Sequence, residues 1–159
     1  MSILARVFCL GLVLLALAAP VAQACTRLPN AATLTAQLLT EVNTRRSRAA
    51  LPRLAREARL ERAAWAVACE NATRNRLSHT TADGGTLTTR VARVGYRWRV
   101  LNENLAMANG TPAQVVQMWM NSPGHRANIL ARGTVHFGAA VARSASGRLY
   151  WAMVSAAPR

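Results

Sequence analysis

Residues 122–130 carry the sequence SPGHRANIL, which places a histidine between a Pro-Gly break and a short apolar run. Because Ser122 precedes a proline, its backbone is biased away from the helical region. The preceding helix should therefore stop here, and His125 should belong to a new element. A titratable ring at such a corner suits ligand binding or proton transfer, but a histidine that only bonds backbone carbonyls would give the same pattern. Residue 125 alone does not decide between these two interpretations.

The first 24 residues have the pattern of a secretory signal peptide. Arg6 supplies a basic start, residues 7–19 are apolar, and Ala-Gln-Ala at 22–24 is a small-x-small cleavage site. The apolar run is shorter than the ~20 residues that a membrane span needs, and no later run is apolar enough to span a bilayer. We therefore predict a secreted monomer, periplasmic or extracellular, without a transmembrane segment. Its parts are a signal peptide at 1–24, a disulfide-tied N-terminal segment at 25–32 and one domain at 33–157.

Cleavage after Ala24 removes Cys9 and leaves two cysteines, Cys25 and Cys69. An even count in an exported chain predicts a disulfide. This bond would enclose 43 residues and contribute roughly 3–4 kcal/mol in the chain-entropy model. The alternative is a lipid-modified Cys25, which normally follows a larger aliphatic residue at the position of Ala22. Gln23 also fits that modification poorly, so the disulfide is favoured.

The chain is strongly basic, with a formal charge of +14. All twenty basic residues are arginines. Such a charge attracts phosphates, acidic lipids and anionic envelope polymers. The arginines are scattered and no basic-aromatic motif of a nucleic-acid module is present, so a specific nucleic-acid partner is not expected.

Apolar residues recur at helical spacing in four segments, 33–46, 53–77, 86–94 and 112–121. The last of these follows a capping box, Thr-Pro-Ala-Gln at 111–114. Apolar and basic residues alternate at 96–101, which predicts a half-buried strand. A turn at 144–147 separates strand-like runs at 135–142 and 148–155, as in an antiparallel hairpin. This order of elements predicts an α+β fold of packed layers.

One carboxylate stands out among the six acidic residues. The other five lie in charged helical segments or, for Asp83, in a glycine-rich turn. Glu103 follows the predicted strand in the sequence LNENLA, where almost no other charge is near. A carboxylate in such a place needs partners. Glu103 is therefore the acid most suited to a functional site.

Two of the three histidines complete a candidate site with Glu103. His79 follows the long predicted helix, and His125 follows the Pro-Gly break. Two imidazoles and a carboxylate suit a weakly bound zinc or another divalent cation, with water or a fourth ligand. His136 lies within a strand pattern and is interpreted as a packing residue. A Ser122–His125 nucleophilic pair has little support, because serine beside proline is usually a local cap and no Gly-x-Ser-x-Gly elbow is present.

Several ordered blocks resemble the CAP superfamily, which comprises cysteine-rich secretory proteins, antigen 5 and plant pathogenesis-related proteins. The similarity is strongest to its short bacterial SCP-like extracellular members. The blocks are EVNTRR at 41–46, RLSH at 76–79, NENLA at 102–106 and WMNSPGHRANIL at 119–130, followed by Phe137-Gly138 and Tyr150-Trp151. The resemblance covers roughly residues 33–155, which is nearly all of the predicted mature chain.

The resemblance implies an α-β-α sandwich with a small, mainly antiparallel sheet between helical layers. It also implies a cleft with two histidines and two acids. His79 matches the first histidine, Glu103 the first acid and His125 the second histidine. Asn121 and Ser122 stand where the second acid belongs, so the set of four is incomplete. Asn102 replaces the glycine that usually precedes the glutamate.

Members of this superfamily bind sterols and other lipids, or divalent metals in the cleft. The favoured hypothesis is a secreted binding protein that holds a metal or a polar or lipid ligand at His79, Glu103 and His125, beside Asn121 and Ser122. One alternative is a metal-assisted hydrolase of envelope material with Glu103 as general base. The other is a structural or adhesive domain in which the same residues form only a polar network.

Overall fold

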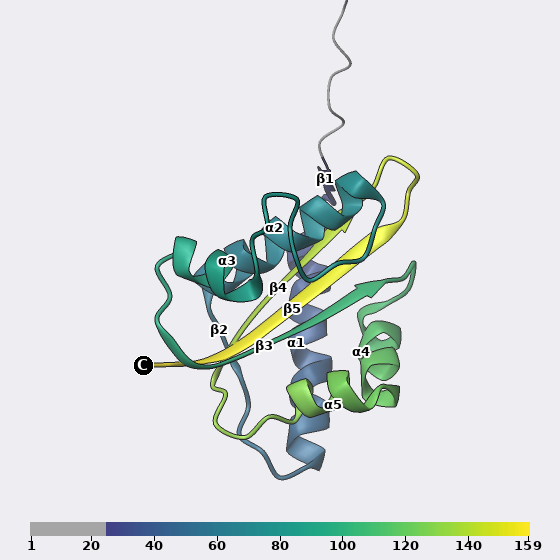
Figure 1. Ribbon diagram of the computed structural model, residues 1–159. Helices are drawn as coiled ribbons and strands as arrows, with labels where there is room; N and C mark the ends of the chain where they lie inside the picture. Colours follow the sequence, from purple (N-terminus) through teal and green to yellow (C-terminus); the bar gives the residue numbers. More distant parts are fainter. Residues whose placement is uncertain (1–24) are drawn as a thin grey trace, which may run out of the picture.

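The computed structural model describes residues 25–159, so the predicted signal peptide and Cys9 lie outside the described residues. The elements are β1 (Thr26–Arg27), α1 (Ala31–Arg48), β2 (Ala55–Arg56), α2 (Ala58–Arg74), α3 (Leu87–Arg93), β3 (Trp98–Met107), α4 (Pro112–Asn121), α5 (Pro123–Ile129), β4 (His136–Arg143) and β5 (Leu149–Pro158). Helices α2 and α3 cover one face of the sheet, and α1, α4 and α5 lie on the other side (Figure 1). The predicted α-β-α sandwich is therefore confirmed. Within residues 25–159, no helix is long and apolar enough to cross a membrane.

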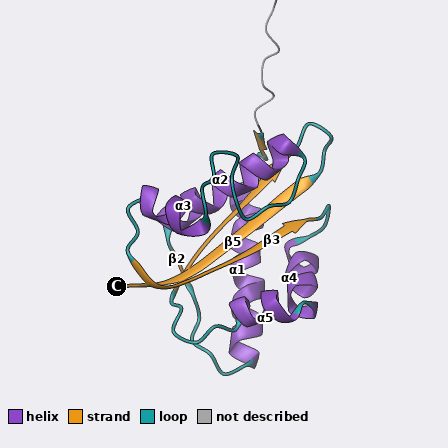
Figure 2. Cartoon of the chain, viewed as in Figure 1, coloured by secondary structure: helices purple, strands orange, loops and turns teal. Residues whose placement is uncertain are grey.

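The sheet is mainly antiparallel, with the strand order β1-β4-β5-β3. The two-residue β2 also pairs with β4, in the parallel direction. Strands β4 and β5 form the predicted hairpin, and they lie at the centre of the sandwich with β3 beside them (Figure 2). Strand β3 pairs only with β5 among the described strands, so it forms one edge of the sheet.

Successive side chains of β5 belong alternately to two separate hydrophobic cores. Because successive strand residues point to opposite faces, Trp151 and Met153 pack with α1 and α4, whereas Tyr150 and Val154 pack with α2. The two clusters hold the helical layers on opposite sides of one central strand. This packing fixes the positions of the loops at both edges of the sheet.

The capping box and the helix break that the sequence predicts around α4 and α5 are confirmed. The Thr111 hydroxyl accepts a hydrogen bond from the Gln114 amide at 3.3 Å, and the Gln114 side chain accepts one from the Thr111 amide at 2.8 Å. Helix α4 ends at Asn121 and α5 begins at Pro123, so the predicted break before His125 is also correct.

The predicted helix at 53–77 is wrong at both ends. Ala55 and Arg56 instead pair with β4, and Glu57 caps α2 by accepting a hydrogen bond from the Arg59 amide. At the other end, Asn75 adopts a left-handed backbone conformation with φ of 49°, which terminates the helix.

The strand predicted at 96–101 is also misplaced, because β3 runs from Trp98 to Met107. Glu103 therefore lies inside the strand and not after it. The polar residues at 102–104 interrupt the apolar alternation, but they stay in the sheet because β5 pairs with them throughout.

The predicted disulfide joins Cys25 to Cys69, with their Cα atoms 5.2 Å apart. It connects the residue before β1 to α2. A disulfide-bonded Cys25 has no thiol to carry a lipid, so the structure supports the disulfide over lipidation.

Candidate functional site at the β3 edge

The loop after α2 carries His79 and is fixed by a side chain of the helix itself. Asn71 donates from Nδ2 to the Ser78 carbonyl at 3.0 Å and accepts from the Ser78 amide at 3.1 Å. This pair of bonds acts like an added piece of backbone pairing, since it satisfies both backbone groups of Ser78. His79 is therefore presented at a defined position beside β3.

Glu103 is buried, and both of its carboxylate oxygens are engaged. Oε1 accepts from Nδ1 of His79 at 2.8 Å, and Oε2 accepts from Arg90 Nη2 at 2.5 Å. The side chains of Glu103 and Arg90 are only 3% and 2% exposed, whereas that of His79 is 61% exposed. The result is an interior ion pair that holds an exposed imidazole.

Arg90, on α3, also ties the loop to the sheet. Its Nη1 donates to the carbonyls of His79 at 2.8 Å and Gly85 at 3.0 Å. The Arg90 guanidinium thus connects residues 79 and 85, both between α2 and α3, to Glu103. Sequence reasoning missed this residue, because nothing local distinguishes Arg90 from the other arginines of a strongly basic chain.

The short helix α5 covers the free edge of β3. Asn128 donates from Nδ2 to the Glu103 carbonyl at 3.0 Å and to Asn104 Oδ1 at 2.8 Å. Asn104 in turn donates to the His125 carbonyl at 2.9 Å. These bonds hold the His125 backbone next to the strand that carries Glu103, so His125 lies at the same edge of the sheet as Glu103 and His79.

The two imidazoles have opposite electrostatic environments. The hydrogen bond that His79 donates to Glu103 raises the pKa of His79 above 6.5, although partial burial opposes this shift. Burial lowers the pKa of His125 below 6.5, and the nearby His79 lowers it further. His79 is therefore the first of the two to take up a proton as the pH falls.

Asn121 and Ser122 are less involved than their position predicts. The Asn121 side chain accepts a hydrogen bond from Gln117 at 2.9 Å, and Ser122 links α4 to α5 without a side-chain cap bond. Within the described residues, neither hydrogen-bonds to His79, Glu103 or His125. His136 bonds to Tyr96 Oη at 2.8 Å, which agrees with the packing role interpreted from its strand pattern.

The donor set does not fit a three-ligand metal centre. No group of three or more His, Cys, Asp or Glu side chains within residues 25–159 is arranged to hold a metal ion. Glu103 already accepts bonds on both oxygens, one of them from a guanidinium whose charge repels a cation. Burial of the Glu103 side chain, which is 3% exposed, leaves it poorly suited as a general base, because a base must lie within reach of the proton it removes.

We expect His79 to titrate at a higher pH than His125, with Glu103 as the cause. A raised folded-state pKa stabilises the protein below the unfolded pKa, near 6.5, and that contribution fades as the pH rises through the folded value. The lowered pKa of His125 acts in the opposite sense, since its contribution is present above pH 6.5 and is lost as the pH falls. Imidazole Cε1–H signals followed by NMR from pH 5 to 9 measure both midpoints.

Glu103→Gln provides the control for this titration. Removing the carboxylate charge should lower the midpoint of His79. An unchanged His79 midpoint in Glu103→Gln would contradict the assignment of Glu103 as the group that holds the proton on His79.

A sequence profile of the cysteine-rich secretory protein family, CAP, matches residues 39–155, and the chain belongs to this family. Protein YkwD of Bacillus subtilis is 31% identical over 104 residues, which are 65% of this chain and 40% of that protein. An outer surface protein of Borrelia burgdorferi has the same fold, with a TM-score of 0.77 and 19% identity over 85% of this chain and 99% of that chain.

An extracellular protein with an SCP domain from Bacillus anthracis is similar as well. It is 25% identical, with a TM-score of 0.72, over 80% of this chain and 41% of that chain. The chain thus spans about two fifths of the length of the Bacillus relatives. The shared part is the CAP domain, a domain that occurs in extracellular proteins.

Proposed function

We propose that the chain is an exported binding protein in which His79 and His125 hold an anionic oxygen group of an envelope ligand, such as a carboxylate or a phosphate. Glu103 and Arg90 are positioning residues in this proposal. The imidazole of His79 makes the main contact, and His125 makes the second.

The exposure of a fixed imidazole carries the proposal. Buried Glu103 holds Nδ1 of His79, and buried Arg90 holds Glu103 and the His79 carbonyl, yet most of the His79 side chain remains open to solvent. A side chain held in one orientation before binding loses little conformational entropy when a ligand arrives. With Nδ1 engaged by Glu103, the other ring nitrogen, Nε2, is left for a ligand.

Charge also favours an anionic group. Glu103 favours the protonated form of His79, which donates a charge-assisted hydrogen bond. The strongly basic chain adds long-range attraction for the same sign of ligand. An exported location would bring His79 and His125 into contact with envelope polymers that carry carboxylates and phosphates.

A purely structural role for the network is the competing explanation. Asn128, Asn104 and Arg90 connect α5, β3 and α3 through hydrogen bonds that any stable fold could use. That explanation predicts a stability loss when His79 is replaced and no ligand contact at its ring.

Inorganic sulfate is a suitable probe, since its charge does not change between pH 6 and 8. We expect sulfate to shift the Cε1–H signal of His79, and to bind more weakly at pH 8 than at pH 6, because a smaller fraction of His79 is protonated at pH 8. His79→Gln should remove this binding, and His125→Gln should weaken it. NMR titration with sulfate at both pH values measures the effect at a single ring.

His136→Gln is the matched control, because it removes a histidine that bonds Tyr96 and neither His79 nor Glu103. It should leave sulfate binding unchanged. No shift at His79 with a lower melting temperature for His79→Gln would favour the structural explanation. Stoichiometric zinc uptake that excludes sulfate would favour a metal site instead.

A further inference from the structure

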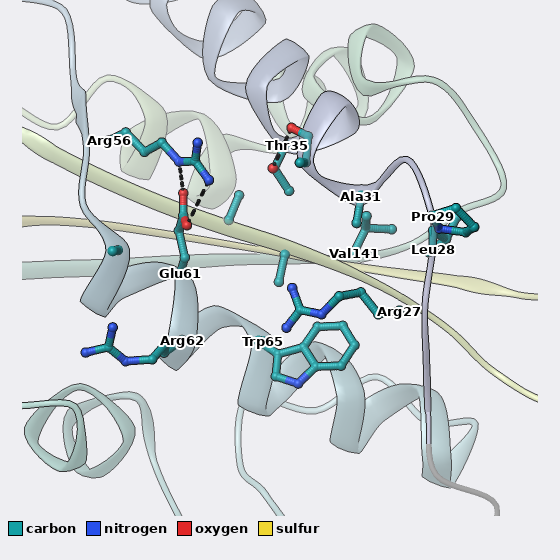
Figure 3. A pocket seen from close by; sticks show the side chains of 14 residues that line it. Arg27, Leu28, Pro29, Ala31, Thr35, Arg56, Glu61, Arg62, Trp65 and Val141 are labelled. Atoms are coloured by element: carbon teal, nitrogen blue, oxygen red, sulfur yellow. Dashed lines mark hydrogen bonds and ion pairs between the residues drawn. The ribbon is translucent and has the colours of Figure 1, made fainter.

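A cavity of about 620 Å³ lies between the start of α1 and the first turns of α2 (Figure 3). Its lining includes Arg27 of β1 and Arg56 of β2, so the cavity lies between the two short strands that pair with β4. None of His79, Glu103 and His125 lines it. Strand β3, which carries Glu103, is at the opposite edge of the sheet. The cavity is therefore separate from the residues of the proposed function.

Part of the lining is apolar and accessible. Pro29, Ala32 and Ala58 line the cavity and are exposed. Ala139 and Val141 of β4 also line it, but they are almost fully buried. The apolar surface that a ligand can reach therefore comes from α1, α2 and the segment before α1. Small-molecule sites combine such a surface with a few polar groups, in volumes of about 300–1,000 Å³.

The charged side chains around the cavity are mostly positive and face solvent. Arg27, Arg56 and Arg62 are exposed, and Glu61 is the only acid among the lining residues. Glu61 pairs with Arg56. No acidic side chain within residues 25–159 pairs with Arg27 or Arg62. Two guanidinium groups beside the cavity are thus open to an anionic ligand.

Arg27 is stacked on an aromatic ring. Its guanidinium carbon lies 4.0 Å from the centre of the Trp65 ring, and both side chains line the cavity (Figure 3). Trp65 is only half-buried, whereas Trp119 and Trp151 are fully buried core residues. A guanidinium stacked in this way keeps its N–H edge free, and that edge matches the geometry of an acidic oxygen group.

The walls of the cavity are fixed relative to one another. The Cys25–Cys69 disulfide ties the start of β1 to α2, the helix that carries Trp65. Helix α2 in turn crosses β4 so closely that a Cβ on Gly138 would lie 2.2 Å from the Leu60 carbonyl carbon. Because these walls are in place before binding, little conformational entropy is lost when a ligand arrives.

We propose that this cavity binds a small aromatic anion, whose rings contact Trp65 and the exposed alanines of α1 and α2 and whose acid group pairs with Arg27. An inorganic anion would use the guanidinium groups alone and leave the apolar lining uncovered. A neutral aromatic compound would leave the guanidinium groups unpaired. Because guanidinium groups stack on planar rings, the Arg27–Trp65 pair favours an aromatic body over an acyl chain.

The probe is anilinonaphthalene sulfonate, compared with phenylnaphthylamine, which has the same rings and no sulfonate. We expect the sulfonate to bind about tenfold more tightly, as a hydrogen bond between charged groups provides, and to shift the Trp65 indole N–H signal in NMR spectra. Fluorescence titrations at pH 6 and pH 8 should give equal affinities, because arginine does not titrate in this range. Sulfate binding at His79 is expected to depend on pH, so either proposal can fail alone.

Charge variants test the protein side. Arg27→Gln should weaken binding of the sulfonate about tenfold, and Arg132→Gln, which replaces an exposed arginine outside the cavity, should leave it unchanged. Equal weakening by Arg132→Gln would overturn the proposal in favour of general charge attraction. Equal affinities for the two compounds would overturn the pairing with Arg27.

Displacement of the dye tests the aromatic body of the ligand. Naphthalene sulfonate should displace it at a lower concentration than octane sulfonate, which carries the same acid group on an aliphatic chain. The reverse order would overturn the preference for a ring. An unchanged Trp65 indole signal at millimolar dye would refute binding at this cavity, whatever fluorescence is seen.

Discussion

Arg90→Met should lower the free energy of unfolding by about 3–5 kcal/mol, because it leaves a buried carboxylate without its cationic partner. Glu103 is 3% exposed and would retain only the bond from His79. The substitution also removes the donor that the carbonyls of His79 and Gly85 share. Guanidinium denaturation at pH 7, with the disulfide intact, measures the loss.

Arg93→Met is the matched control on the same helix. Arg93 pairs with Asp83, but the two side chains are 60% and 53% exposed. Exposed pairs contribute about 0–1 kcal/mol, so this variant should remain close to the parent protein. The double variant Arg90→Met/Glu103→Leu should regain part of the stability lost in Arg90→Met, since no charge is then left unpaired. Equal losses for Arg90→Met and Arg93→Met would show that the interior pair does not stabilise the fold as argued.

The elements that could be predicted from the sequence have signals within a few residues. Thr111 and Gln114 form a cap with each other, and the Pro123 break separates two helices whatever surrounds them. The hairpin of β4 and β5 likewise depends on a local turn. These parts of the fold agree with the sequence analysis because their physical causes are short-range.

The parts that could not be predicted depend on distant partners. Arg46 and Arg90 are both fully buried among mostly exposed arginines, and each is held by groups far along the chain. Arg46 donates to the Ile129 carbonyl at 2.9 Å, and Arg90 donates to Glu103. Because arginine occupies every basic position, the sequence does not distinguish the buried arginines from the exposed ones. The same reason explains why the site was predicted as three residues and why its guanidinium was missed.

The bounds of the strand around Glu103 also depend on partners that are distant in sequence. Polar residues at 102–104 read as the end of a strand, but Asn104 is buried because Asn128 and the His125 carbonyl satisfy its amide. The short strands β1 and β2 have no pattern of their own, and they exist only because β4 offers an edge. The open cavity between them could therefore be found only in three dimensions.

Removal of the Cys25–Cys69 disulfide should cost about 3–4 kcal/mol, comparable to the loss expected for Arg90→Met. The bond spans 44 positions in sequence, and cross-linking them restricts the unfolded chain. The test is Cys25→Ser/Cys69→Ser, which leaves no cysteine within residues 25–159. Chemical denaturation of this variant beside the oxidised parent gives the difference.

The loss should also have a local component in the folded state. Strand β1 has only two residues paired with β4, and Leu28 behind it is a core residue that is 6% exposed. Without the disulfide, two strand residues and one leucine must hold the N-terminal segment. Amide exchange at residues 26–28 should therefore accelerate in the variant more than exchange in β5. A loss below about 1 kcal/mol would indicate that this packing alone orders the segment, and that the cross-link adds little beyond it.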